Sequence, residues 1–349
     1  MPDPMFISAR EPLPLSGSAF RRLVALATVL TLCLLMLGAW VRLTDAGLGC
    51  PDWPGCYGQL SPSHAQENIA RAVSVQGGEH GPVSMGKAWR EMLHRYVATG
   101  LGVLILVIAA IAWKRRQAMG QSPLLATVLV GVVVLQGLFG KWTVTLLLKP
   151  AIVTGHLLGG ALTFMLLLWL WLRQLPRARY VDAEPVAALR WPALLAMATV
   201  AVQLLLGGWV STNYAALACA DLPGCQGQWW PPVNFSDGFH FVRELGRTAD
   251  GANLSLAALT AIHLAHRLGA LVVLAVVGFA GWRAARADGV RGLGVALLVT
   301  LALQWGLGLS NVWFGLPLPV AVAHNGGAAL LLALTAVLHF RASRARDLV

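Results

Sequence analysis

Histidines within apolar segments are the residues of this sequence best suited to chemistry. His94 lies between Glu91, three positions before it, and Arg95, and His266-Arg267 repeats the His-Arg pair about half a chain later. Ionisable side chains near or in a bilayer cost free energy and mark functional sites. In a helix, the i, i+3 spacing of Glu91 and His94 places both side chains on one face. We therefore expect the Glu91 carboxylate to lie beside His94, which could act as a ligand or as a base.

A second pair of histidines completes the pattern. His156 and His324 are separated by 168 positions, so each half of the chain has two membrane histidines, His94 with His156 and His266 with His324. Two imidazoles from facing helices can bind opposite faces of one haem iron. The alternatives are buried histidines satisfied by hydrogen bonds, and zinc. Zinc prefers four close ligands, and no carboxylate or cysteine set completes one in each half, so the pattern favours haem.

The composition indicates the setting of these residues. The 349 residues are 57% hydrophobic and only 12% charged, which is typical of a polytopic membrane protein. The net charge of +11 arises from Lys and Arg in short loops rather than from a basic domain with interleaved aromatics. This distribution argues against nucleic acid as a partner and indicates that the protein lies in a lipid bilayer.

Eight apolar segments are long enough to cross a bilayer, which needs about 20 residues each. Their expected limits are 22–42, 90–113, 123–145, 150–172, 191–213, 256–282, 292–312 and 318–340. No small-residue cleavage site follows the first segment, so we expect a retained anchor rather than a cleaved signal peptide. Cys33, within that first span, is expected to belong to the protein core.

Basic clusters at every second boundary predict the orientation. They comprise Arg21 and Arg22; Lys114, Arg115 and Arg116; Arg173, Arg177, Arg179 and Arg190; Arg283, Arg286 and Arg291; and Arg341, Arg344 and Arg346. The positive-inside rule puts both termini in the cytoplasm. The two long loops, about 43–89 and 214–255, then face the periplasm or the outside of an inner (plasma) membrane.

A duplication organises the whole chain. Leu37-Gly38-Ala39-Trp40-Val41, Cys50 and Pro54-Gly55-Cys56 recur as Leu206-Gly207-Gly208-Trp209-Val210, Cys219 and Pro223-Gly224-Cys225, with a constant offset of 169. Each copy has four spans, an even number, so both copies enter the membrane in the same orientation. The sequence predicts an all-α membrane protein made of two parallel-repeat four-helix bundles, residues 1–175 and 176–349.

Paired cysteines lie in both long loops. Cys50 and Cys56 are six positions apart, as are Cys219 and Cys225, and Pro and Gly between them can turn the chain back. Outward loops are in an oxidising compartment, where disulfides persist. We expect two local disulfides. A redox-active dithiol is the alternative, and the spacing exceeds that usual for zinc.

Other residues around the histidines have two interpretations each. Arg95 and Arg267 suit haem propionates, or extend to the membrane surface. Gly159-Gly160 and Gly326-Gly327 allow close approach of a macrocycle or of another helix. Glu91 is either a group for proton transfer or charge stabilisation, or an acid favoured at a helix start. The matched residue in the second half is His263, so the two sites are expected to have diverged, one reactive and one purely redox.

These motifs resemble one known family. The stretch Arg42-Leu43-Thr44-Asp45-Ala46-Gly47-Leu48-Gly49-Cys50-Pro51-Asp52-Trp53, together with Glu91-x-x-His94-Arg95, the paired cysteines and eight duplicated spans, resembles the haem A synthases over nearly the whole chain. The resemblance implies that haem O is the substrate, bound at His94 and His156. It also implies haem b at His266 and His324, and Glu91 as the acidic residue implicated in the reaction. His263 is not part of the matching motif.

The resemblance also implies the reaction and its partners. A porphyrin methyl of haem O is hydroxylated twice, and the diol loses water to give the formyl group of haem A. The haem O-forming farnesyltransferase and haem-copper oxidases are the implied partners, with an electron donor and a homo-oligomer left open. The alternatives are a non-catalytic membrane cytochrome b that carries electrons, and a transporter with parallel repeats. Glu91 on one side only and the large loops favour the enzyme.

Overall fold

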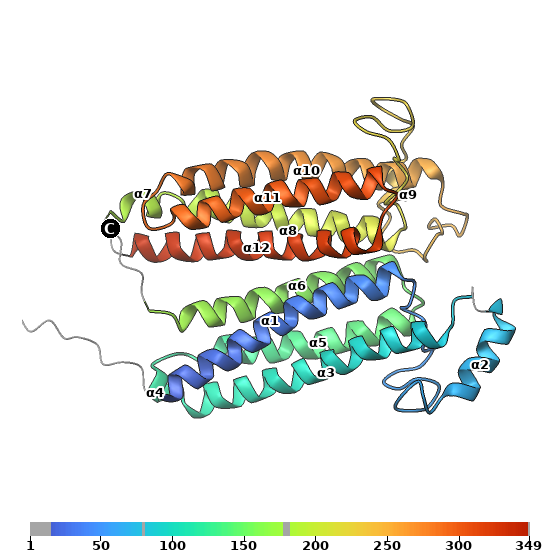
Figure 1. Cartoon of the computed structure of the whole chain (residues 1–349), viewed down its shortest axis with the longest axis horizontal. Coiled ribbons are helices and arrows are strands. Elements are labelled where there is room, and N and C mark those ends of the chain that lie inside the picture. Colours follow the sequence, from blue (N-terminus) through green and yellow to red (C-terminus); the bar gives the residue numbers. More distant parts are fainter. Residues whose placement is uncertain (1–14, 79–80, 177–181, 348–349) are drawn as a thin grey trace, which may run out of the picture.

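Eight long helices make up most of the computed structural model, which describes residues 15–78, 81–176 and 182–347 (Figure 1). They are α1 (Leu15–Leu43), α3 (Met85–Lys114), α5 (Leu124–Thr145), α6 (Pro150–Arg173), α8 (Arg190–Thr212), α10 (Leu256–Ala285), α11 (Arg291–Trp313) and α12 (Leu318–Arg346). The shortest has 22 residues, and at about 1.5 Å per residue it crosses the hydrocarbon core. All eight are apolar enough to span a membrane, so the predicted spans are confirmed, and no strand is formed by the residues described.

Local signals set where the histidine-bearing helices begin. The hydroxyl oxygens of Ser84 and Ser255 accept first-turn N–H groups of α3 and α10, at 3.3 and 3.2 Å. Such caps satisfy N–H groups that have no partner within the helix. In α6 and α12 a proline, Pro150 or Pro319, occupies the first turn, where its missing N–H costs nothing. These starts fix the depth of each histidine along its helix.

The long helices form two groups of four (Figure 1). In the first group α1 packs on α3 and α6, and α5 packs on the same two helices. In the second group α8 packs on α10 and α12, and α11 packs on the same two helices. The order of neighbours is therefore the same in both groups, and each group corresponds to one of the predicted four-helix units.

Contacts between the groups follow the duplication. α1 packs on α12, and α6 packs on α8 and α12. The Arg42 guanidinium donates to the Ser211 carbonyl at 2.7 Å, and the Tyr214 hydroxyl donates to Asp45 at 2.7 Å. Each of these pairs joins positions 169 apart, which is the repeat offset. A residue meets its own counterpart only near an axis that relates the two copies, so the contacts agree with the predicted parallel repeat. The axis itself stays a prediction.

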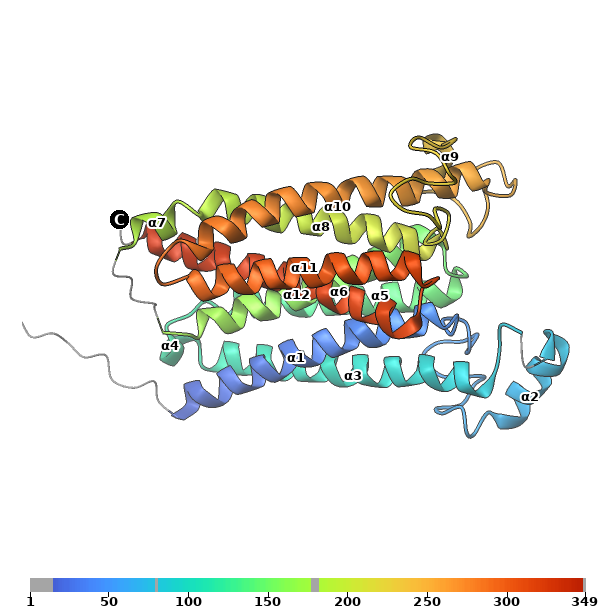
Figure 2. The same cartoon turned by 45° about the horizontal axis from the view of Figure 1, so that its top comes forward.

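Both long loops lie at the same end of the helices (Figure 2). They include the short helices α2 (Gln66–Val75) and α9 (Phe235–Gly238), which the sequence analysis missed. At the opposite end lie α4 (Arg116–Met119) and α7 (Glu184–Ala187), beside several of the basic clusters. Arg177 and Arg179 fall outside the described residues. The predicted cytoplasmic position of the termini stays a prediction, since no membrane is present.

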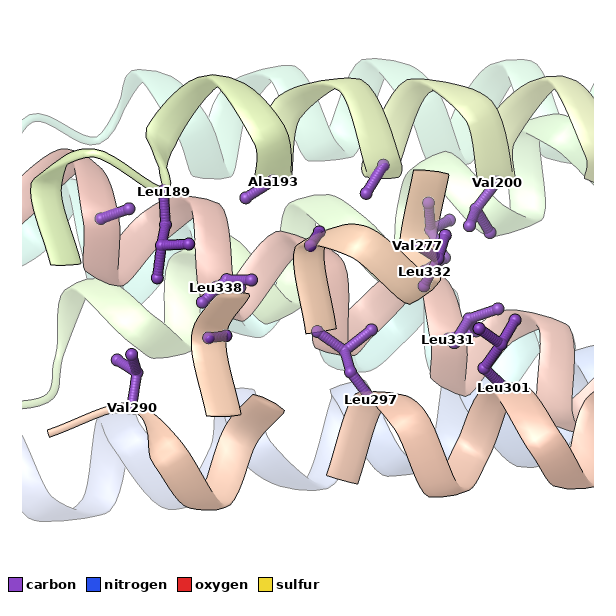
Figure 3. Close-up of a cluster of buried hydrophobic side chains, with 14 of the residues drawn as sticks. Leu189, Ala193, Val200, Val277, Val290, Leu297, Leu301, Leu331, Leu332 and Leu338 are labelled. Atoms are coloured by element: carbon purple, nitrogen blue, oxygen red, sulfur yellow. The ribbon is translucent and has the colours of Figure 1, made fainter. Parts of the chain in front are cut away.

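Apolar side chains fill the interior of each group and also cover its outer surface. In the second group Leu297 and Leu301 of α11 pack with Leu331 and Leu332 of α12 (Figure 3). The prediction that Cys33 lies in the core is wrong, because this thiol is exposed. A membrane helix is apolar on all sides, so apolar neighbours in the sequence do not distinguish the core from the lipid-facing surface.

The hairpin of α10 and α11 depends on the absence of a side chain at Gly294. A Cβ there would lie 2.2 Å from the backbone nitrogen of Ala285, whereas a Cβ at Gly292 would have no neighbour within 4 Å. We expect Gly294→Ala to lower the thermal unfolding midpoint in detergent, because overpacking against backbone costs about 1–3 kcal/mol. The control Gly292→Ala should unfold at or above the wild-type temperature. Equal midpoints for the two variants would contradict this packing.

Candidate functional site

The four predicted histidines lie toward the loop end of their helices, on α3, α6, α10 and α12. The imidazole rings of His94 and His156 face each other across the first group, with centroids 6.4 Å apart and planes inclined at 64°. The structure therefore brings together the first pair that the sequence analysis predicts. A space of this size between two imidazoles suits a single metal ion, because metal–imidazole bonds are about 2 Å long.

Each of these imidazole rings lies against a glycine of a neighbouring helix. A Cβ at Gly38, Gly140, Gly207 or Gly308 would lie 3.1 to 3.5 Å from an atom of His94, His156, His266 or His324, respectively. These glycines stand on α1, α5, α8 and α11, the four long helices that have no ligand histidine. The sequence analysis missed their role, although their repetition at offsets of 169 (Gly38 and Gly207) and 168 (Gly140 and Gly308) carried the signal.

Unpaired ring nitrogens remain within this arrangement. The Nδ1 atoms of His156 and His324 are buried and have no hydrogen-bond partner. Among the described residues no group of three or more His, Cys, Asp or Glu could hold a metal ion. Each half offers two imidazoles, which suits a cofactor that supplies its own equatorial ligands, such as a porphyrin. The residues present therefore fit a haem better than a bare metal ion.

Glu91 and His263 occupy matched positions and make matched contacts with the loops. The Glu91 carboxylate, 5% exposed, accepts the N–H of Cys50 at 2.9 Å and forms an ion pair with Arg95. His263, 4% exposed, accepts the N–H of Cys219 through Nδ1 at 3.2 Å. The Glu91 side chain thus contacts the loop and Arg95. A role for His263 in fastening a loop explains its presence beside His266 without making it a ligand.

Disulfides close two short loops at this end of the molecule. Cys50 is bonded to Cys56 and Cys219 to Cys225, as the sequence predicts. We name residues 50–59 the first disulfide loop and residues 219–228 the second disulfide loop. Both loops end in a turn with two consecutive residues at positive φ, Tyr57-Gly58 and Gln226-Gly227, which is the geometry of a type I′ turn.

An aspartate inside each disulfide loop fixes that turn. Asp52 accepts the N–H groups of Tyr57 and Gly58, at 2.5 and 2.8 Å. Asp221 does the same in the second disulfide loop, at 2.7 and 2.9 Å. The hydrogen bond from Gly227 is the main cause that lowers the pKa of the Asp221 carboxyl. A lowered pKa in the folded state means that this carboxylate supports the loop above its unfolded pKa, and that the support is lost as the pH falls through the folded pKa.

Arg95 and Arg267 hold the disulfide loops against their helices. Arg95 donates to the carbonyls of Asp52 and Gly55, both at 2.7 Å. Arg267 donates to the carbonyls of Asp221, Gly224 and Cys219, at 3.0, 2.8 and 2.7 Å. The predicted contact with propionates is not tested by these bonds. They show that each arginine, which directly follows a candidate ligand in the sequence, joins its helix to the adjacent disulfide loop.

Comparisons with known proteins agree with this arrangement. The model of the COX15-CtaA family, described as a cytochrome oxidase assembly protein, matches residues 21–336. The haem A synthase of Shewanella oneidensis is 41% identical over 310 residues, which cover 89% of this chain and 92% of that protein. The haem A synthase of Sphingopyxis alaskensis is 30% identical over 363 residues, with 97% and 95% covered. The haem A synthase of Rhizorhabdus wittichii is 28% identical, with 93% and 94% covered.

The second disulfide loop tests the role of its arginine. Arg267→Lys replaces a planar group that reaches three carbonyls by an ammonium that cannot span them. Hydrogen bonds to charged groups contribute about 1.5–3 kcal/mol each, so we expect amide hydrogen exchange in residues 219–228 to become at least tenfold faster. Arg291→Lys, at an exposed ion pair on the opposite end, is the control. Unchanged exchange in Arg267→Lys would show that these bonds do not hold the loop.

Proposed function

Because the chain belongs to the COX15-CtaA family of cytochrome oxidase assembly proteins, we propose that it is a haem A synthase. Its substrate is haem O, and its product is haem A. A porphyrin methyl is hydroxylated twice, and the resulting diol loses water to leave a formyl group. The observation that carries this proposal is the 41% identity to a haem A synthase along 89% of the chain. The protein is thus a membrane-bound haem-dependent oxidoreductase.

The first half, residues 1–175, is the part that we assign to haem O. His94 and His156 bind the substrate iron from opposite sides. Support comes from the 6.4 Å separation of their ring centroids and from the buried Nδ1 of His156, which has no partner. Gly38 and Gly140 leave both rings free of side-chain contact from α1 and α5 at these points.

The second half, residues 176–349, is the part that we assign to a permanently bound haem b. His266 and His324 are its ligands, supported by the matching glycines Gly207 and Gly308 and by the unpaired Nδ1 of His324. Haem b supplies one-electron redox chemistry when bound. Arg267 has a buried Nε–H without an acceptor, and we assign this donor to a propionate oxygen. By the repeat, Arg95 takes the same role toward the substrate.

Glu91 is the residue that we assign to the reaction. Its buried carboxylate stands one turn before His94 and forms an ion pair with the Arg95 guanidinium. Oxidising a methyl group at the porphyrin edge develops positive charge or releases a proton, and a nearby anion or base eases both. Its counterpart in the second half, His263, carries no such negative charge, which fits a second haem that only transfers electrons.

The setting and the partners follow from the same proposal. We place the protein in the inner (plasma) membrane with cytoplasmic termini and with both disulfide loops on the outer, oxidising side, which the two disulfides support. The farnesyltransferase that forms haem O is the expected source of substrate, and an electron donor is a further partner. Exposed apolar faces of the helices leave room for a homo-oligomer within the bilayer.

Replacement of the second-half histidines tests the haem b assignment. His266→Ala and His324→Ala should each remove the low-spin visible spectrum of the purified protein, because one of the two histidines that would hold the haem is lost. His263→Ala, one turn away, should keep the haem, since its imidazole bonds the loop. A full wild-type spectrum and haem content in both ligand variants would exclude the assignment.

Glu91 separates catalysis from loop anchoring. In Glu91→Gln the amide oxygen can still accept the Cys50 N–H, but the negative charge is lost. We expect conversion of haem O to fall below detection while haem b and the Cys50–Cys56 disulfide remain. The measurement is chromatography of haems extracted from cells that also make haem O, with peptide mapping of the disulfide. Normal haem A in Glu91→Gln would remove the catalytic role, and loss of haem b as well would make the residue structural.

A further inference from the structure

Gln203 makes the most direct contact with a candidate haem ligand. It lies on α8, and its amide nitrogen donates to the backbone carbonyl of His266 at 2.9 Å. The same nitrogen is 3.0 Å from Nδ1 of the His266 ring. One side chain on a neighbouring helix therefore holds both the backbone and the imidazole of this residue.

Gly269 provides the space that Gln203 occupies. A Cβ at Gly269 would lie 2.3 Å from the Oε1 atom of Gln203, which any larger residue would displace. That oxygen is buried and has no hydrogen-bond donor. An imidazole that binds a metal through one nitrogen carries its proton on the other and needs an acceptor for it. A turn of the Gln203 amide would bring its unpaired oxygen to the Nδ1–H of His266, in exchange for the present hydrogen bond to the His266 carbonyl.

The same device appears at the second ligand of this half. Gln304 on α11 donates to the backbone carbonyl of His324 at 3.0 Å, and its amide nitrogen lies 3.5 Å from Nε2 of that ring, whereas Gln203 faces Nδ1 of His266. A Cβ at Gly327 would lie 2.3 Å from the Gln304 oxygen, which is also buried and unpaired. Both imidazoles of the second half thus have a glutamine seated over a glycine.

The first half lacks this device at His94. With the repeat offsets of 169 and 172, the positions matched to Gln203 and Gly269 are Leu34 and Val97. Neither residue can accept a hydrogen bond through its side chain. At His156 the first half retains a glutamine, Gln136, whose amide nitrogen fills the space over Gly159. No hydrogen bond among the described residues joins Gln136 to that histidine.

We propose that Gln203, seated over Gly269, is a positioning residue that fixes His266 as a permanent haem ligand, and that Leu34 and Val97 leave His94 unfixed so that the first half can release its haem. This inference rests on the proposed function, in which one haem is retained and another is taken up, oxidised and given away. The retained haem gains from a ligand whose orientation and tautomer are set in advance. A haem that must leave gains from a ligand without such support.

Gln203→Leu tests the first part of the proposal. Loss of an outer hydrogen-bond partner weakens metal binding about 10–100-fold, so we expect haem b to transfer to excess apomyoglobin at least tenfold faster than from the wild type. The midpoint potential of the remaining haem should rise, because the ligand becomes a weaker donor to ferric iron. Thr199→Val is the matched control. Thr199 lies one turn earlier on α8 and bonds its own helix.

The double substitution Leu34→Gln with Val97→Gly tests the second part. It rebuilds the second-half device beside His94, so the first-half haem should be lost to apomyoglobin at least tenfold more slowly than in the wild type. Release of haem A should slow with it, while the haem b spectrum stays unchanged. Leu34→Gln alone, without the space made by glycine, is the control and should have a smaller effect.

The outcomes distinguish this inference from the function on which it rests. Faster loss and a raised potential in Gln203→Leu, with unchanged values in Thr199→Val, support it. Wild-type loss rates and potential in Gln203→Leu overturn it and leave the haem A synthase proposal standing. A wild-type protein that contains no haem b overturns the assignment of the second half itself.

Discussion

The pairing of imidazoles across each four-helix group is the constraint on which the rest of the structure depends. A polar ring in hydrocarbon needs a partner, because no water is there to bind it. His94 and His156 face each other with 6.4 Å between ring centroids, and the buried Nδ1 of His156 has no hydrogen-bond partner, which leaves this need for a ligand to meet. The two helices without a ligand histidine contribute glycines such as Gly38, so that the rings are not displaced by neighbouring side chains. The helix starts set the position of each ring along its helix, and Arg95 and Arg267 join the adjacent residues to the disulfide loops.

Duplication gives two copies of one scaffold, to which we assign different chemical roles. The disulfide loops, their aspartates and the arginines that bind them are alike in both halves. The two halves differ at a few positions around the histidines. Glu91 and His263 both accept the N–H of a loop cysteine, but only Glu91 can add a negative charge. Gln203 has no counterpart in the first half, where Leu34 stands. A charge placed in one half and a fixed ligand in the other are small changes, yet in the proposed function they separate a site for conversion from a site for retention.

The sequence predicted the eight spans and the two disulfides because hydropathy and repeated spacing express them directly. It also predicted the pairing of His94 with His156. It could not predict that Cys33 is exposed, since lipid and protein core select the same apolar residues. It missed Gln203 because its importance depends on which helix lies beside α10. Long-range contacts such as those of Arg267 with the loop carbonyls could not be predicted either, because the sequence does not show which acceptors the fold brings to an arginine.

The most direct test of this account is the number and type of haems bound per chain in the wild-type protein. The protein would be purified from cells with and without a haem O source, and its haems extracted, identified by chromatography and counted against polypeptide. The account predicts one haem b per chain in both preparations, and additional haem O or haem A only where haem O is made. Two haem b per chain in both preparations, with no haem A, would contradict it and indicate a membrane cytochrome b.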